Sequence, residues 1–184
     1  MDSEISITKE RRKSMSYSTI LTIEPNGDVV PHTEIHNGTL AMTIWNHISK
    51  EYGLRVLFGE TPEIWSWCGE GKLKRHHDIV MAFTFDHVIV YKKDIPKLIE
   101  AFNEFMLECP TETMKTQIET LTKIQEEDII GVAWQQTSVS DSLWTTNPMD
   151  DVDSEDYDID LDISVPYNIY KGDQHWDLFD ELKL

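Results

Sequence analysis

Cysteine is scarce in this sequence: Cys68 and Cys109 are the only two among 184 residues. Two cysteines cannot form a disulfide framework, so the composition favours a reducing compartment, although a single bridge between them stays open. No apolar run is long enough to span a membrane, and none follows the basic residues at 9–13 as it would in a signal peptide. We therefore expect a soluble protein in the cytoplasm of a host cell, with no membrane partner.

Recognisable catalytic motifs are also lacking. The sequence has no Gly-x-Gly-x-x-Gly, no Walker phosphate loop, no Gly-x-Ser-x-Gly and no Cys-x-x-Cys. The short run Gly69-Glu70-Gly71-Lys72 resembles a phosphate loop only superficially, because the carboxylate of Glu70 would repel a phosphate. We therefore expect neither an enzyme nor a cofactor.

Positive charge is scarce as well, with 16 lysines and arginines against 34 aspartates and glutamates, for a net charge of −18. Residues 141–184 carry −11 of this charge and residues 1–140 carry −7. Such an excess repels nucleic acid and anionic membranes, so we expect no direct binding to either. A basic protein would be attracted, and it is the partner that the charge favours.

The most unusual stretch runs from Asp150 to Asp162 and is called the acidic segment below. It has eight carboxylates in thirteen residues and no basic residue. From Tyr157 to Val165 apolar and polar residues alternate, which is typical of a half-buried strand. Acidic side chains on one face would then be about 6.6 Å apart, the scale of successive phosphates in a nucleic acid. The predicted partner-binding carboxylates are Asp150, Asp151, Asp153, Glu155, Asp156, Asp158, Asp160 and Asp162.

The acidic segment has two other interpretations. Acidic runs are often solvated faces or disordered tails that keep a protein soluble. A calcium loop would use the two-residue spacing of Asp151, Asp153 and Glu155. Such a loop needs a glycine at its sixth position and a glutamate at its twelfth, where this chain has Asp156 and Asp162, so the calcium interpretation is disfavoured.

Apolar periodicity predicts an α+β domain over residues 16–140, with a flexible extension before it at 1–15. The domain should have a mainly antiparallel sheet with two or three helices packed on one face. A hairpin turn is expected at Asn26-Gly27, and Asp94 and Thr111 are expected to cap helices. The predicted strands are 17–24, 29–36, 54–58, 79–91 and 129–134, and the predicted helices are 39–52, 94–109 and 111–124.

Residues 141–184 form the acidic C-terminal part, which we expect to pack on the same domain. Near its end, Trp176, Phe179 and Leu182 recur at helical spacing between acidic residues. Such a helix can dock into an apolar groove of a partner, and Trp176 and Phe179 are therefore predicted partner-binding residues. The other interpretation is that the helix folds back onto its own domain.

His76, His77 and Asp78 are the candidate metal-ligating or acid-base residues. Neighbours in sequence point in different directions, so this triplet alone cannot converge on one atom. The basic residues just before it, at 72–75, form the only local basic patch. This patch either contacts phosphate or pairs with acidic side chains of the same molecule, and we favour the second.

These features lead to one main hypothesis. The protein is expected to be a non-catalytic inhibitor of a nucleic-acid-binding protein, such as a CRISPR-type or other defence nuclease. The acidic segment would act as a DNA mimic and occupy the basic groove of that enzyme. Viral counter-defence proteins, including anti-CRISPR inhibitors, often have this character, which is an analogy and not a match to a family.

Two alternatives belong to different functional classes. An immunity or regulatory protein would block a cognate toxin or effector outside a nucleic-acid groove, using acidic residues together with Trp65, Trp67 and Trp176. A metal- or phosphate-dependent enzyme would have its site around residues 76–78. The sequence does not indicate the oligomeric state.

Overall fold

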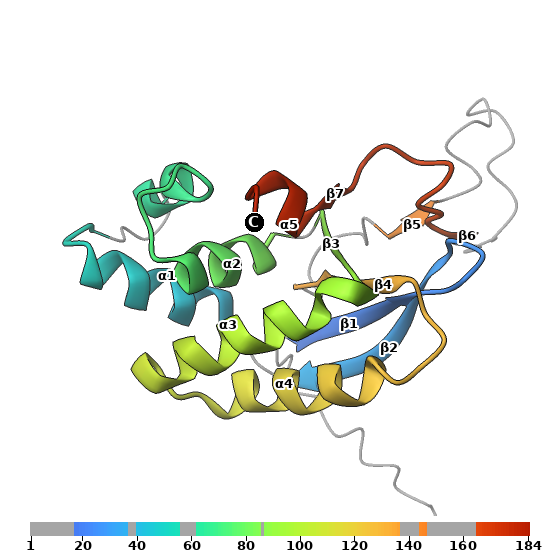
Figure 1. Cartoon of the computed structure of the whole chain (residues 1–184), viewed down its shortest axis with the longest axis horizontal. Helices are drawn as coiled ribbons and strands as arrows, with labels where there is room; N and C mark the ends of the chain where they lie inside the picture. The colour runs from blue at the N-terminus through green and yellow to red at the C-terminus, as the bar shows by residue number, and fades with distance from the viewer. Residues whose placement is uncertain (1–16, 37–39, 56–61, 86, 137–143, 147–164) are drawn as a thin grey trace, which may run out of the picture.

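The computed structural model describes residues 17–36, 40–55, 62–85, 87–136, 144–146 and 165–184 of the chain (Figure 1). Its elements are β1 (Tyr17–Ile23), β2 (Val29–His36), α1 (Leu40–Glu51), η1 (Glu63–Trp67), α2 (Arg75–Phe83), β3 (Val88–Tyr91), η2 (Lys92–Asp94), α3 (Ile95–Glu108), α4 (Glu112–Ile124), β4 (Gly131–Gln135), β5 (Thr145–Thr146), β6 (Val165–Pro166), β7 (Trp176–Asp177) and α5 (Leu178–Glu181).

Five of the strands form one sheet in the order β2-β1-β4-β3-β7. Neighbouring strands are antiparallel except for β3 and β7, which are parallel. The predicted α+β class with a mainly antiparallel sheet is therefore confirmed. None of the helices in the described ranges is long and apolar enough to cross a membrane.

The first two strands form the hairpin that the sequence predicts. Gly27 in the turn has a φ of +89°, which favours glycine, and the amide of Asp28 donates to Oδ1 of Asn26 at 3.0 Å. Strand β2 lies at the edge of the sheet, as expected from Pro31, which has no amide hydrogen to donate. The register shifts opposite Pro31, after Ile20 of β1.

The predicted strand at 79–91 is wrong in its first part, because residues 75–83 form helix α2. Every residue of α2 from His77 to Phe83 is buried. A segment that is apolar on all sides shows no helical period, so its sequence cannot be distinguished from a buried strand. Only Val88–Tyr91 forms a strand. Leu54 and Arg55 belong to no strand, and the rest of the predicted strand at 54–58 lies outside the described residues.

The two helices after β3 begin differently. Thr111 caps α4 as predicted, because its Oγ1 accepts a hydrogen bond from the amide of Met114 at 3.1 Å. Asp94 is at the N-cap position of α3, as predicted, but its side chain makes no capping hydrogen bond. Its carboxylate pairs instead with Nζ of Lys97 at 2.8 Å.

Two apolar cores contact the sheet. Ile20 belongs to the larger core, which also contains buried side chains from α1, α2, α3 and α4. Leu21 belongs to the smaller core, together with Trp144, Tyr167 and Ile169 from the C-terminal part. Successive residues of a strand point to opposite faces, so Trp144, Tyr167 and Ile169 lie on the face opposite Ile20, whereas Leu178 and Phe179 of α5 belong to the larger core. The described residues of the C-terminal part, 144–146 and 165–184, therefore contribute to both cores.

A substitution at Phe83 tests whether α2 is buried in the larger core. Phe83 is fully buried, and its ring centroid lies 4.8 Å from that of Phe102 and 5.1 Å from that of Trp134. Replacing Phe83 by alanine should lower the free energy of unfolding by about 3–5 kcal/mol, because it leaves a cavity in the larger core. Leu107→Ala, at a side chain that is 88% exposed, should change it by less than about 0.5 kcal/mol. Urea unfolding followed by circular dichroism measures both, and equal effects would contradict the placement.

Candidate functional site

The predicted binding carboxylates, Asp150 to Asp162, lie outside the described residues, but the chain on both sides of them is described. Thr146 of β5 pairs with Val165 of β6 in an antiparallel pair. Residues 147–164 therefore connect two strands that lie side by side. The predicted strand at 157–165 is likewise outside the described residues, except for Val165.

Residues 144–146 and 165–167 are called the stem below, and they are fixed to the domain by buried contacts. Nε1 of Trp144 donates to the carbonyl of Trp134 in β4 at 2.8 Å. The amide of Tyr167 donates to the carbonyl of Trp144 at 2.7 Å, and the carbonyl of Tyr167 accepts from the amide of Val29 at 2.8 Å. Trp144 and Tyr167 are both only 3% exposed. The stem residues on both sides of 147–164 are therefore fixed to the sheet.

The two C-terminal aromatic residues predicted to bind a partner lie in different surroundings. Phe179 is 2% exposed and belongs to the larger core, so it is not available to a partner in this structure. Trp176 is half-buried and lines a pocket of about 300 Å³ with Trp65, Phe85 and Leu182. The C-terminal helix thus folds back onto its own domain, as the second interpretation predicts.

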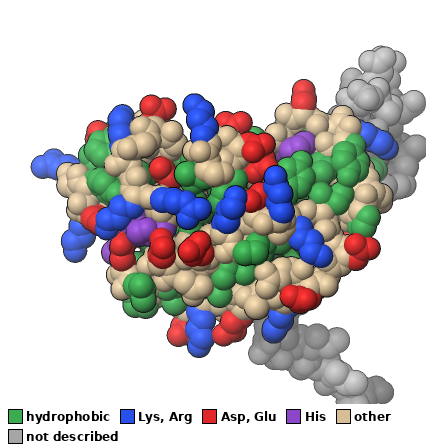
Figure 2. Space-filling view, in the orientation of Figure 1, with side chains coloured by type: hydrophobic (Ala, Val, Ile, Leu, Met, Phe, Trp, Pro, Cys, Tyr) green, Lys and Arg blue, Asp and Glu red, His purple; other side chains and the backbone are tan. Residues whose placement is uncertain are grey.

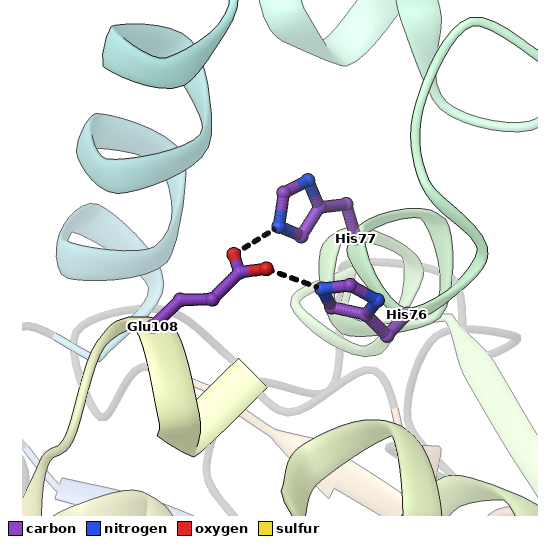
Figure 3. Close-up of side chains that lie close together, drawn as sticks. All are labelled: His76, His77 and Glu108. Atoms are coloured by element: carbon purple, nitrogen blue, oxygen red, sulfur yellow. Dashed lines mark hydrogen bonds and ion pairs between the residues drawn. The ribbon is translucent and has the colours of Figure 1, made fainter. Parts of the chain in front are cut away.

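His76 and His77 both contact Glu108, which is not among the residues predicted from the sequence. Figure 3 shows both imidazole rings directed at its carboxylate. Nε2 of His77 lies 2.7 Å from one carboxylate oxygen, and Nε2 of His76 lies 3.1 Å from the other. Asp78 points elsewhere, and its Oδ1 accepts a hydrogen bond from the amide of Gly69 at 3.0 Å. The triplet 76–78 therefore divides between two places.

Side chains of α1 and of Lys74, the residue before α2, join this contact. Nζ of Lys74 contacts Glu51 and lies 3.2 Å from Oε1 of Glu108. Nε2 of His47 lies 3.7 Å from Oε2 of Glu108, and Oε2 of Glu51 lies 3.6 Å from Nε2 of His77. The helix-end cluster, as we call it, consists of His47, Glu51, Lys74, His76, His77 and Glu108.

The cluster lies where the last turns of α1 and α3 meet the first turn of α2. On the face shown in Figure 2, histidine lies between acidic and basic side chains in this region. Lys74 pairs with acids of α1 and α3, and Arg75 lies 4.0 Å from Glu100. Lys74 and Arg75 of the basic patch thus pair with acidic side chains of the same molecule, as we expected, whereas Nζ of Lys72 lies 5.5 Å from the ring centroid of Trp67.

Burial and hydrogen bonding set the charges of the cluster. Burial lowers the pKa of His77, although its hydrogen bond to Glu108 opposes this shift. Burial alone would raise the pKa of Glu108, but hydrogen bonds from His77 and Lys74 outweigh it and lower this pKa to about 2. The hydrogen bond of Lys74 to Glu51, followed by that to Glu108, raises the pKa of Lys74. At neutral pH a neutral His77 therefore faces an ionised Glu108.

Part of this cluster has a signal in the sequence. His47 and Glu51 are four residues apart on the predicted helix at 39–52, so their side chains share one face. Glu108 gives no comparable signal, because only the packing of α3 against α2 brings it to the histidines. No family model, no curated protein and no solved structure matches this chain.

Cys68 is not prepared for nucleophilic chemistry. Its Sγ lies 3.7 Å from the carbonyl oxygen of Asp78, to which it donates a weak hydrogen bond. Burial, followed by the charge of Asp78, raises the pKa of the thiol to about 12. A nucleophilic thiol needs the opposite shift.

The alkylation rate of Cys68 tests whether its thiol is buried in this way. At pH 8 a pKa of about 12 leaves roughly a thousandth of the thiolate present in an ordinary cysteine, so alkylation by iodoacetamide should slow about 1000-fold relative to the unfolded chain. Peptide mass spectrometry follows Cys68 and Cys109 separately, with the urea-unfolded chain as the control. A rate for native Cys68 equal to that in urea would contradict the burial described here.

Proposed function

We propose that this protein is a non-catalytic inhibitor that binds a basic surface of a nucleic-acid-binding protein through its acidic segment. The observation that carries the proposal is the placement of eight carboxylates, with no basic residue among them, between the paired strands of the stem. The segment would compete with nucleic acid for lysines and arginines that otherwise bind phosphates. A defence nuclease is one enzyme class with such a groove.

The stem supports this proposal because it reduces the loss of conformational entropy when a partner binds. An acidic tail attached at one end loses much conformational freedom when a partner orders it. Here Thr146 and Val165 are already paired, so the cost of closing this loop is met when the domain folds. Residues 147–164 can extend at most about 30 Å from the stem, because the chain must return and each residue spans at most about 3.4 Å. The eight carboxylates of the acidic segment therefore stay within this distance of the stem.

The surface of the described residues carries charges of both signs, and its contrast with the acidic segment supports the proposal. Figure 2 shows lysines and arginines interspersed with acidic side chains on the described face. Several of these charges are paired, including Lys74 with Glu108 and Lys97 with Asp94. A mixed surface attracts a polycationic groove weakly, whereas a run of carboxylates without counter-charges attracts it strongly. We therefore assign partner binding to the acidic segment.

Charge reversal in the segment tests the proposal. The triple variant Asp158→Lys, Asp160→Lys and Asp162→Lys should lose the partner in a pull-down from the native host and should no longer displace labelled DNA from it. The control is the triple variant Glu70→Lys, Glu119→Lys and Glu126→Lys, which changes the net charge equally at exposed positions elsewhere. Undiminished inhibition by the first variant would refute the proposal. A captured partner whose DNA binding is unaffected by the wild type would favour the immunity alternative.

Ionic strength gives a second test, because screening weakens contacts between exposed charges. Raising NaCl from 50 to 500 mM should weaken the wild-type complex at least about tenfold, mainly through slower association. Docking through the apolar pocket at Trp65 and Trp176 would depend little on salt. Surface plasmon resonance at several salt concentrations measures both rates, and a salt-independent affinity would contradict binding through the acidic segment.

A further inference from the structure

We infer that the helix-end cluster binds one divalent transition-metal ion of the zinc class, through Nε2 of His76, Nε2 of His77 and the carboxylate of Glu108. Imidazole and carboxylate are the ligands that such ions take in three-residue protein sites. This inference does not depend on the proposed function. In Figure 1 the junction of α1 and α2 and the strands β5 and β6 lie at opposite ends of the molecule.

The spacing of the donor atoms suits one ion. The three atoms all lie within 4.8 Å of one another, and the two nitrogens lie 3.1 and 2.7 Å from the carboxylate oxygens. Ligand atoms about 2.0–2.1 Å from a tetrahedral ion are about 3.3 Å apart. The two nitrogen–oxygen distances are about 0.2 and 0.6 Å shorter than this spacing, so an outward movement of that size admits the ion between Glu108 and the two rings.

The far side of each ring is oriented as in metal sites. Metal-bound histidines usually donate their second ring N–H to a carboxylate or another acceptor, which fixes the ring and its tautomer. Nδ1 of His76 lies 3.2 Å from Oε2 of Glu104, and Nδ1 of His77 lies 3.3 Å from the hydroxyl oxygen of Tyr52. Both rings can therefore hold a proton on Nδ1 and direct a lone pair on Nε2 toward the ion.

The neighbouring residues supply further donors and the required charge. Nε2 of His47 is buried without a hydrogen-bond partner and faces Glu108, and Oε2 of Glu51 lies near His77. Either atom can occupy a fourth position. The carboxylates of Glu51 and Glu108 lie beside His77 and those of Glu104 and Glu108 lie beside His76, and a dication offsets two of these three negative charges.

Lys74 is the internal competitor of the metal. Its ammonium group occupies the same carboxylates, Glu51 and Glu108, that the ion would neutralise. A dication at Glu108 would repel this ammonium group and displace it into solvent, which is feasible because the side chain is 48% exposed. Replacing Lys74 by methionine should therefore strengthen metal binding, whereas in a purely structural ion-pair network it would leave metal binding unchanged.

Cobalt(II) titration of the full chain, after treatment with a chelator, tests the inference. The wild type should develop the visible absorption of low-coordinate cobalt at one equivalent. Glu108→Gln and His76→Gln should weaken binding by more than about 100-fold, and Glu104→Gln, which removes the charged partner of His76 Nδ1 but no ligand atom, by about tenfold. Lys74→Met should bind more tightly than the wild type.

Two controls separate this site from other binding. His87→Ala removes an exposed histidine elsewhere, and the triple variant Asp158→Asn, Asp160→Asn and Asp162→Asn weakens the acidic segment. Both should keep the wild-type cobalt affinity. Equal binding by wild type, Glu108→Gln and Glu104→Gln would overturn the inference, as would loss of binding only in the aspartate variant.

Discussion

The burial of Trp134 in the central strand β4 is the constraint on which both layers of the molecule depend. Its ring packs against Phe83 of α2, and its Nε1 donates to Oε1 of Gln117 in α4 at 3.2 Å. Its backbone carbonyl accepts the indole N–H of Trp144, which belongs to the stem. One residue thus contacts α2, α4 and the stem. The stem owes its fixed position to this residue as much as to its own two short strands.

Much of the fold is predictable because its periods are clear. Alternating apolar and polar residues predict the two strands of the hairpin, and apolar residues at three- and four-residue spacing predict the helices at 40–51, 95–108 and 112–124. Helix α2 has no stripe, because it packs against both α1 and α3 and is buried on all sides. Strand β7 is only two residues long and pairs in parallel with β3, so no local sequence pattern predicts it. The class was therefore predictable, but the identity of two elements was not.

The helix-end cluster shows a similar division. His76 and His77 are conspicuous in sequence, and the helical spacing of His47 and Glu51 places that pair on one face. The partner that unites them, Glu108, follows only from the angle at which α3 packs on α2. Local sequence thus identifies ligand types, whereas tertiary packing decides which of them share a point in space. The sequence likewise shows the charge of the acidic segment but not the pairing of Thr146 with Val165.

Because Thr146 pairs with Val165, the folding of the domain depends little on the sequence between these two residues. Doubling the length of a flexible loop between fixed ends costs only about 0.6 kcal/mol. A chain that differed from this one between Thr146 and Val165 could therefore keep the contacts of Trp144 and Tyr167. In this sense the stem is an attachment point for loop grafting, at which a different sequence could be inserted without a new fold.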